Sequence, residues 1–207
     1  DLVLLLDLDP AAAALRLDIN LQGMRLIDPK RSEDLERFAT RLVEIRHDKG
    51  LTLAEAGEQV RDNNYFAALM LEAAQADAVV AGATVSASSA LRPLFQIIPL
   101  LEQVQTASSL MILDFDEKKV GSGGSIFLAD CGVIPEPTAE QLCDIAISTA
   151  VIAQHLTNEI PRVAMLSYAT HSASTQPTLV KVRTATALAR ARAEAAGLEM
   201  EIDGEIQ

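Results

Sequence analysis

The stretch SIFLADCGVIPEPTAEQLCDIAISTAVIA, residues 125–153, contains the signals that decide the fold expected for this chain. It opens with an apolar run, residues 126–129, that has the length and composition of a buried β-strand. Pro135 and Pro137 follow, and because proline disrupts both strand and helix they predict a stiff, exposed connection. Apolar residues then recur at helical spacing over 138–156, which predicts a helix with one continuous inward face. The stretch therefore predicts a strand–turn–helix unit of an α/β fold.

Polar residues mark both the end of this strand and the start of this helix. Asp130 and Cys131 stand where the strand should end, and ligands of open α/β sheets bind outside such carboxyl ends. Thr138 and Gln141 form a capping box, in which each side chain accepts a hydrogen bond from the other residue's open backbone amide. Asp130 and Cys131 are therefore candidate site residues at a strand end.

The composition fits a helix-covered sheet and argues against two classes of partner. Of the 207 residues, 49% are apolar but only 3% are aromatic, so the core is built from aliphatic side chains, as in parallel sheets. The net charge of −12 argues against a nucleic-acid partner, although a local basic pocket still permits an anionic ligand. No apolar run reaches membrane-spanning length, and DLVLLLDLDP at residues 1–10 lacks the basic start of a signal peptide. We therefore expect neither nucleic acid nor a membrane as partner.

The two cysteines, Cys131 and Cys143, lack the spacing of a zinc site, so no metal site is expected. Two reduced thiols are typical of a cytoplasmic protein. Cys131 has no histidine near it in sequence that would activate it as a nucleophile. The alternative is that it serves as a small buried residue.

Predicted strands and helices alternate along the chain, which predicts α/β architecture with mainly parallel strands. We expect strands at residues 2–6, 24–27, 78–83, 109–115, 125–129, 162–168 and 198–202, with an alanine-rich stretch at 11–15. We expect helices at residues 32–49, 52–60, 65–75, 138–156 and 178–196, and one more after residue 88. The glycine-rich DEKKVGSGG at 116–124 fits a hairpin turn better than a phosphate-binding loop, because no helix follows it.

A polar segment, AGATVSASSALRP at residues 81–93, joins a predicted strand to a predicted helix. Free backbone amides at a helix start bind anions, and Ser86, Ser88 and Arg92 could add donors. The alternative is that Ser88 or Ser89 only caps the helix and that Arg92 is merely solvated. Both interpretations fit the residues.

A second polar segment, SYATHSASTQP at residues 167–177, repeats this pattern after another predicted strand. Its hydroxyl groups belong to Ser167, Tyr168, Thr170, Ser172, Ser174 and Thr175. A Ser/Thr-rich linker is the alternative, but linkers do not usually join a buried strand to a regular helix. His171 is either an anion contact or a surface residue, and we favour a surface residue.

Three long, ungapped motifs point to a known family. They are LADCGVIPEPTAEQLCDIAI at 128–147, AGATVSASSALRPLFQII at 81–98, and PRVAMLSYATHS at 161–172 followed by VKVRTAT at 180–186. In these motifs the chain resembles the phosphate acetyl/butyryltransferase family, and the similarity extends over essentially the whole sequence. Val85, Ile134 and Ala169 stand where the family usually has histidine, asparagine and serine.

The resemblance implies a fold and a set of site residues. It implies two α/β/α sandwich domains with mainly parallel sheets and an interdomain cleft, similar to isocitrate and isopropylmalate dehydrogenases. The first domain would span 1–129 without its leading strand, and the second would span 130–207 without its later part. The family's reactive Ser-Arg pair and Asp lie in a motif of the NDLSRG kind, which these residues do not contain, so we assign no catalytic residue and expect the polypeptide to continue past Gln207. The expected substrate-binding residues are Ser86, Ser88, Arg92, Asp130, Cys131, Ser167, Tyr168 and Thr170.

The resemblance also implies an activity, the transfer of an acetyl group between coenzyme A and inorganic phosphate. Acetyl-CoA and phosphate would give acetyl phosphate and CoA, which requires a base for the thiol and donors for the phosphate and the developing oxyanion. No metal or redox cofactor is expected, which fits the lack of metal-ligand clusters in the sequence, and coenzyme A is a substrate. The expected partners are acetyl-CoA or CoA, phosphate and acetyl phosphate, bound by a cytoplasmic homodimer or higher oligomer.

Three alternatives stay open at this point. The first is a phosphate butyryltransferase-type enzyme, which differs only in the size of its acyl pocket. The second is a non-catalytic acetyl-CoA-sensing domain of a larger enzyme such as malic enzyme, which Val85, Ile134 and Ala169 favour because apolar residues replace polar ones. The third is a structural α/β module whose serine-rich loops only cap helices.

Overall fold

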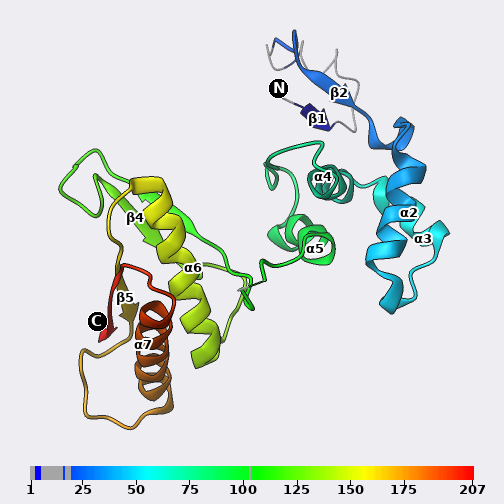
Figure 1. The fold of residues 1–207 in the computed structure, drawn as a ribbon. Helices are drawn as coiled ribbons and strands as arrows, with labels where there is room; N and C mark the ends of the chain where they lie inside the picture. The colour runs from blue at the N-terminus through cyan, green and yellow to red at the C-terminus, as the bar shows by residue number, and fades with distance from the viewer. Residues whose placement is uncertain (1–2, 6–15, 17–19, 103) are drawn as a thin grey trace. The chain divides into compact units, whose positions relative to one another are not determined.

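A computed structural model of the chain describes residues 3–5, 16, 20–102 and 104–207 (Figure 1). The chain divides into two compact units, Asp1–Pro99 and Leu100–Gln207, and each is described by itself. The division after Pro99 groups residues by their contacts within this chain and does not define domains of a longer protein. The domain boundary expected after residue 129 therefore stays a prediction. Together the units give a mixed α/β architecture of helices and two-stranded sheets.

The first unit combines a short parallel strand pair with helices. β1 (Val3–Leu5) pairs in parallel with β2 (Arg25–Ile27). The other elements are η1 (Pro29–Arg31), α2 (Leu35–Ile45), η2 (His47–Lys49), α3 (Leu53–Val60), α4 (Asn63–Glu72) and α5 (Ala87–Ile97). The helices expected at 52–60 and 65–75 are confirmed within three residues at each end, and the one expected at 32–49 is split into α2 and η2. The alanine-rich stretch at 11–15 lies outside the described residues.

The strand expected at residues 78–83 is wrong. These residues have no regular secondary structure, and the side chain of Val80 is 100% exposed. A strand is stabilised by backbone hydrogen bonds to a neighbouring strand, and in the described part of the chain β1 and β2 pair only with each other. The apolar run therefore lacks the partner that would make it a strand.

The core of the first unit is aliphatic with one aromatic pair. Phe38 and Leu42 of α2, Val60 of α3 and Phe66 of α4 are each at most 1% exposed. The rings of Phe38 and Phe66 meet edge to face, with centroids 5.0 Å apart and planes at 70°. Such a pair stabilises by about 0.5–1.5 kcal/mol beyond its buried area. The pair joins α2 to α4 in the core.

The second unit contains the strand–turn–helix stretch from which the prediction started. β3 (Met111–Asp114) and β4 (Ser125–Leu128) form an antiparallel hairpin, which confirms the hairpin interpretation of the glycine-rich segment. α6 (Ala139–Thr157) begins with the predicted capping box, because Gln141 N donates to Thr138 Oγ1 at 3.2 Å and Thr138 N to Gln141 Oε1 at 2.9 Å. β5 (Arg162–Leu166) pairs in parallel with β6 (Glu201–Ile206), and α7 (Pro177–Ala195) connects them.

The end of α7 displaces the last strand from its expected position at 198–202 to β6 at 201–206. Gly197 adopts a left-handed φ of 64° and its N–H donates to Glu194 O at 3.1 Å, while Leu198 N donates to Ala193 O at 2.9 Å. These two hydrogen bonds form a Schellman motif, so residues 197 and 198 belong to the C-terminal cap of α7. The strand therefore starts only after it.

Small residues allow the layers of the second unit to approach closely. Cys143 of α6 and Ala185 and Ala189 of α7 are fully buried where the two helices meet. A β-carbon at Gly204 of β6 would lie 2.5 Å from Thr186 Oγ1 of α7, closer than real contacts allow. Glycine is therefore required where β6 passes under α7. Among the described residues, no helix combines the length and hydropathy that crossing a membrane requires.

Candidate functional site

Asp130 organises the turn that follows β4. Its Oδ1 accepts hydrogen bonds from the amides of Ser109 at 2.9 Å and Gly132 at 3.1 Å, and also from the Ser109 hydroxyl. Its Oδ2 accepts from the amides of Val133 at 3.2 Å and Ile134 at 2.7 Å. The carboxylate thus ties the strand end to the segment before β3 and shapes the 130–134 turn.

These donors set the charge of the Asp130 side chain. Burial alone would raise the pKa of the Asp130 carboxyl, but hydrogen bonds from Ser109, Gly132 and Ile134 outweigh it and hold that pKa below its usual range. The group is therefore a stable anion whose lone pairs are already used. A role for Asp130 in direct substrate contact stays a prediction, while its role in shaping the turn is visible in the structure.

The turn presents Cys131 at the surface. Its side chain is exposed and carries a free thiol, with Sγ 3.2 Å from Leu128 O, and its amide donates to Ser109 Oγ at 2.8 Å. Cys143 is the opposite case, since it is fully buried and burial raises the pKa of its thiol. The interpretation of Cys131 as a small buried residue is therefore wrong, because the turn directs it outward.

The polar segment after β5 places the next three predicted residues. Ser167 N donates to Ile206 O at 2.8 Å, and its hydroxyl donates to Ala169 O, so Ser167 fixes the first bend. Tyr168 is exposed, and its hydroxyl donates to Gln176 Oε1 at 2.7 Å. Thr170 Oγ1 accepts from Gln207 N at 2.9 Å. All three residues lie in the segment after β5. Asp130 and Cys131 lie after β4, in the same compact unit.

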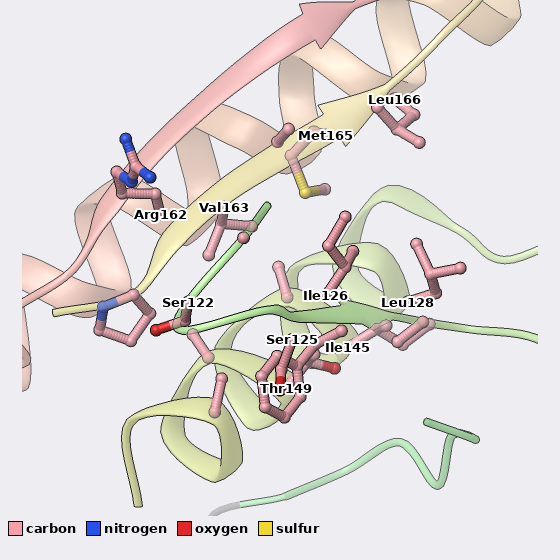
Figure 2. A pocket seen from close by; sticks show the side chains of 18 of the residues that line it. Ser122, Ser125, Ile126, Leu128, Ile145, Thr149, Arg162, Val163, Met165 and Leu166 are labelled. Atoms are coloured by element: carbon pink, nitrogen blue, oxygen red, sulfur yellow. The ribbon is translucent and has the colours of Figure 1, made fainter. Parts of the chain in front are cut away.

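A cavity of about 700 Å³ separates β4 from β5 above α6 (Figure 2). Figure 2 shows the side chains of Ile126, Val163 and Met165 extending into the space between the two strands. Most of the lining is apolar, and Ala129 and Leu166 are its last residues on the two chain segments. Asp130 and Ser167 follow these residues directly in the sequence. The predicted polar residues therefore lie at the end of an apolar cavity.

The start of α5 in the first unit carries the remaining predicted residues. Ser86 is the N-cap of α5, and its Oγ accepts from Ser89 N at 3.3 Å. Ser88 Oγ lies 3.0 Å from Ser86 Oγ. The alternative in which Ser88 or Ser89 caps this helix is therefore wrong, since Ser86 does so. The guanidinium of Arg92 is exposed and makes no hydrogen bond or ion pair with any part of the chain that the structure describes.

The sequence interpretation missed a cluster of cations around this helix. Arg46 and Lys49 line a small hollow of about 230 Å³ that also reaches Glu55 of α3 and Gln96 of α5, and Lys49 pairs with Asp48 at 3.1 Å. Tyr65 donates to Gln96 Oε1 at 2.9 Å, and although burial raises the pKa of Tyr65, the positive charges of Arg92 and Arg46 oppose that rise. Both guanidinium groups therefore lie near Tyr65. We call Arg46, Lys49 and Arg92 the basic cluster; its signal in the sequence is the RHDKG run at 46–50.

The two groups of predicted residues belong to different compact units. Ser86, Ser88 and Arg92 lie in the first unit, and the other five lie in the second. The interdomain cleft that the family resemblance implies stays a prediction. In the described ranges, no group of three or more His, Cys, Asp or Glu side chains could hold a metal ion.

Comparison with known proteins identifies the family. The sequence matches the family described as phosphate acetyl/butaryl transferase over residues 1–207. The chain belongs to this family. Two phosphate acetyltransferases illustrate the similarity. The protein of Thermoanaerobacterium thermosaccharolyticum is 39% identical over 100% of this chain and 62% of its own length. That of Treponema pallidum is 40% identical over 93% of this chain and 57% of its own length.

Solved structures of phosphate acetyl/butaryl transferases resemble the fold as well. The EutD phosphotransacetylase of Staphylococcus aureus superimposes with a TM-score of 0.78 at 31% identity, over 95% of this chain and 57% of that one. A phosphotransacetylase of Streptococcus pyogenes gives 0.79 at 28% identity, over 93% and 56%. The chain therefore spans about three fifths of the length of these four relatives.

Proposed function

We propose that this chain is part of a phosphate acetyltransferase, which moves an acetyl group between coenzyme A and inorganic phosphate. The observation that carries the proposal is 39% identity to a phosphate acetyltransferase along the whole of this chain. In the direction of acetyl-CoA synthesis, the CoA sulfur forms a bond to the acetyl carbon of acetyl phosphate. The bond from that carbon to the phosphate oxygen breaks, and phosphate leaves with the electron pair. Coenzyme A is a substrate, so the reaction calls for no further cofactor.

The basic cluster supports this proposal from the first unit. CoA carries several phosphate groups, and a guanidinium binds phosphate through a planar fork of N–H donors. The guanidinium of Arg92 is exposed and makes no hydrogen bond or ion pair with any described residue, so it can bind a ligand without first breaking a contact. Arg46 and Lys49 border a hollow with the amide side chain of Gln96. Glu55 also lines this hollow and Lys49 pairs with Asp48 at 3.1 Å, so Arg92 is the member of the cluster that best fits an anion.

The second unit would contribute the polar strand ends. The 130–134 turn and the segment after β5 lie beyond an apolar cavity, where α/β proteins bind ligands. We propose that, in the whole protein, residues 1–129 and 130–207 belong to two α/β/α sandwich domains that face each other across a cleft, as in isocitrate and isopropylmalate dehydrogenases. Ser86, Ser88, Arg92, Cys131, Ser167, Tyr168 and Thr170 would line that cleft, and Asp130 would shape it.

We further propose a cytoplasmic homodimer or higher oligomer. Cys131 and Cys143 are both free, which fits a reducing compartment. Exposed apolar side chains on α6, such as Ile152 and Leu156, offer surface that an oligomer would bury. Sedimentation of the protein tests the oligomer, and a strictly monomeric species would refute that part of the proposal.

The activity is tested by incubating the polypeptide that contains this chain with acetyl-CoA and following the free thiol. Thiol release that requires inorganic phosphate and yields acetyl phosphate supports the proposal. Thiol release at the same rate without phosphate refutes it. A comparison of acetyl-CoA with butyryl-CoA decides the acyl group, and we expect acetyl-CoA to be preferred.

A second candidate is an acetyl-CoA-sensing domain without catalysis. Val85, at the loop before α5, is a partly exposed apolar residue in the segment where polar donors are expected. Saturable binding of acetyl-CoA with no phosphate-dependent thiol release identifies this function. It would leave the role of the basic cluster intact.

A further inference from the structure

Glu205 of β6 is a buried carboxylate that faces the Ser/Thr-rich segment after β5. Its side chain is 0% exposed, and its Oε1 accepts a hydrogen bond from Ser172 N at 2.5 Å. Its backbone oxygen accepts from His171 N at 3.2 Å. Burying a carboxylate is costly unless it is paired and hydrogen-bonded. A residue of this kind at the edge of a proposed site therefore requires an explanation.

Arg183 of α7 provides the pairing. Its Nε lies 3.4 Å from Glu205 Oε2, its Nη1 donates to Ser172 O at 2.7 Å, and its Nη2 donates to Ser174 O. The guanidinium therefore donates hydrogen bonds to two backbone carbonyls and faces the carboxylate as an ion pair, with no hydrogen bond to Glu205 Oε2 among the described residues. Together the two side chains hold both polar groups of the Ser172 backbone and the carbonyl of Ser174.

This arrangement leaves three hydroxyl groups as donors. Ser172 Oγ accepts from Ser174 N at 3.1 Å, Ser174 Oγ accepts from Gln176 N at 3.3 Å, and Thr170 Oγ1 accepts from Gln207 N at 2.9 Å. Each hydroxyl is thus oriented by an incoming N–H, and its own hydrogen finds no acceptor among the described residues. A phosphate group accepts hydrogen bonds only, so it matches such donors.

We propose that Glu205 and Arg183 are positioning residues that hold segment 170–174 so that the hydroxyls of Thr170, Ser172 and Ser174 bind a phosphate group of the substrate. The identity of the ligand rests on the proposed function, whereas the positioning role rests on contacts within the second unit. Arg183 lies in the VKVRTAT motif at 180–186, but that motif does not indicate a partner for it. The roles of both residues follow from β6 and α7 meeting at this segment.

Arg183→Lys tests the proposal, with Arg190→Lys as its matched control. Lysine retains the positive charge but has no fork, so it cannot serve Glu205 and both carbonyls together. Arg190 lies seven residues further along α7 and also binds β6, through Ile202 O at 2.7 Å and Asp203 Oδ1 at 2.7 Å, but it makes no contact with segment 170–174. Asp203 also lies 3.7 Å from His171 Nε2 through its other carboxylate oxygen, so the control alters an arginine between the same two elements while the segment keeps its contacts with Glu205 and Arg183.

Three measurements on each variant give the outcome. We expect faster amide hydrogen exchange in residues 168–176 without ligand, an acetyl phosphate Kd raised about tenfold, and a melting temperature equal to that of Arg190→Lys. Unchanged exchange, or faster exchange with an unchanged Kd, would overturn the proposal. Equal loosening of the segment in both variants would also overturn it, because the effect would then be a general loss of stability.

A second variant guards against a failure of Arg183→Lys to fold. Glu205→Gln keeps an oxygen for Ser172 N and removes the charge that pairs with Arg183, so it should loosen the same segment to a smaller extent. A Glu205→Gln chain with wild-type exchange and wild-type Kd would contradict the pairing role. If the unmodified chain bound neither CoA nor acetyl phosphate, the proposed function would fail, while the exchange data alone would still decide whether the pair holds the segment.

Discussion

Replacing Asp130 with asparagine is expected to destabilise the chain by about 2–4 kcal/mol. Hydrogen bonds to a charged group contribute about 1.5–3 kcal/mol each, and Oδ2 accepts two, from Val133 N and from Ile134 N at 2.7 Å. The asparagine amide places N–H groups against these N–H donors or, if it flips, against the amides of Ser109 and Gly132. Because the turn is partly exposed, water can replace some of the lost hydrogen bonds. The expected loss of unfolding free energy is therefore at most about that of two such bonds.

The pH dependence of this difference follows from the lowered pKa of Asp130. The folded-state pKa is depressed below the reference of 3.8, so the ionised side chain contributes its full stability above about pH 4. Below that pH the unfolded chain takes up a proton before the folded chain does. The difference between wild type and Asp130→Asn should therefore shrink by roughly 1.4 kcal/mol per pH unit as the pH falls.

Urea unfolding of both proteins from pH 7 to pH 3 measures this difference. Asp114→Asn is the control, because Asp114 is exposed on β3 and its carboxylate makes two weak contacts among the described residues: it accepts a hydrogen bond from Ser125 Oγ at 3.3 Å and pairs with the exposed Lys118 at 3.6 Å. It should leave the stability nearly unchanged. A difference between wild type and Asp130→Asn that stays constant over this pH range would refute the reasoning, since it would then not depend on the charge.

Three further changes test other parts of the structure. Gly204→Ala places a β-carbon 2.5 Å from the hydroxyl oxygen of Thr186 and should lower the free energy of unfolding in urea by about 1–3 kcal/mol. Gly57→Ala, where a β-carbon would meet nothing within 4 Å, is the control and should not destabilise the chain. Equal effects of the two substitutions would show that β6 is not tightly packed. Phe38→Leu removes the edge-to-face ring pair and should destabilise the first unit by about 1–2 kcal/mol, and a neutral result would exclude that contact. Iodoacetamide should alkylate Cys131 in the folded chain and Cys143 only after unfolding, as peptide mass spectrometry would show; early modification of Cys143 would contradict its burial.

Local signals in the sequence predicted much of the second unit. The capping box at Thr138 and the prolines before it act within a few residues, so the start of α6 could be located from the sequence alone. The hairpin between β3 and β4 likewise follows from its own turn residues. The residues at 78–83 show the limit of such reasoning, because an apolar run becomes a strand only beside a partner, and pairing is decided by distant residues.

The candidate site could be predicted only where its residues gave a local signal in the sequence. Strand ends and serine-rich segments are visible in one stretch of sequence, so Ser86 and Ser167 were found, although the role of Ser86 as the helix cap was not. The basic cluster requires α2 and α5 to lie side by side, and its member Arg46 gave only a weak local signal. The pairing of Glu205 with Arg183 depends on how β6 passes α7, which no periodicity encodes.

Titration of the chain with coenzyme A in a calorimeter tests the central claim most directly. The account predicts saturable binding, weakened about ten- to a hundredfold by Arg92→Ala at an unchanged melting temperature, because a charge-assisted bond to phosphate contributes about 1.5–3 kcal/mol. Arg31→Ala is the control, since Arg31 is largely exposed and, within the described part of the chain, its side chain pairs only with Asp28 at 3.6 Å; this variant should bind as wild type does. Binding of coenzyme A that Arg92→Ala leaves unchanged, with a lowered melting temperature, would make Arg92 structural and contradict the account.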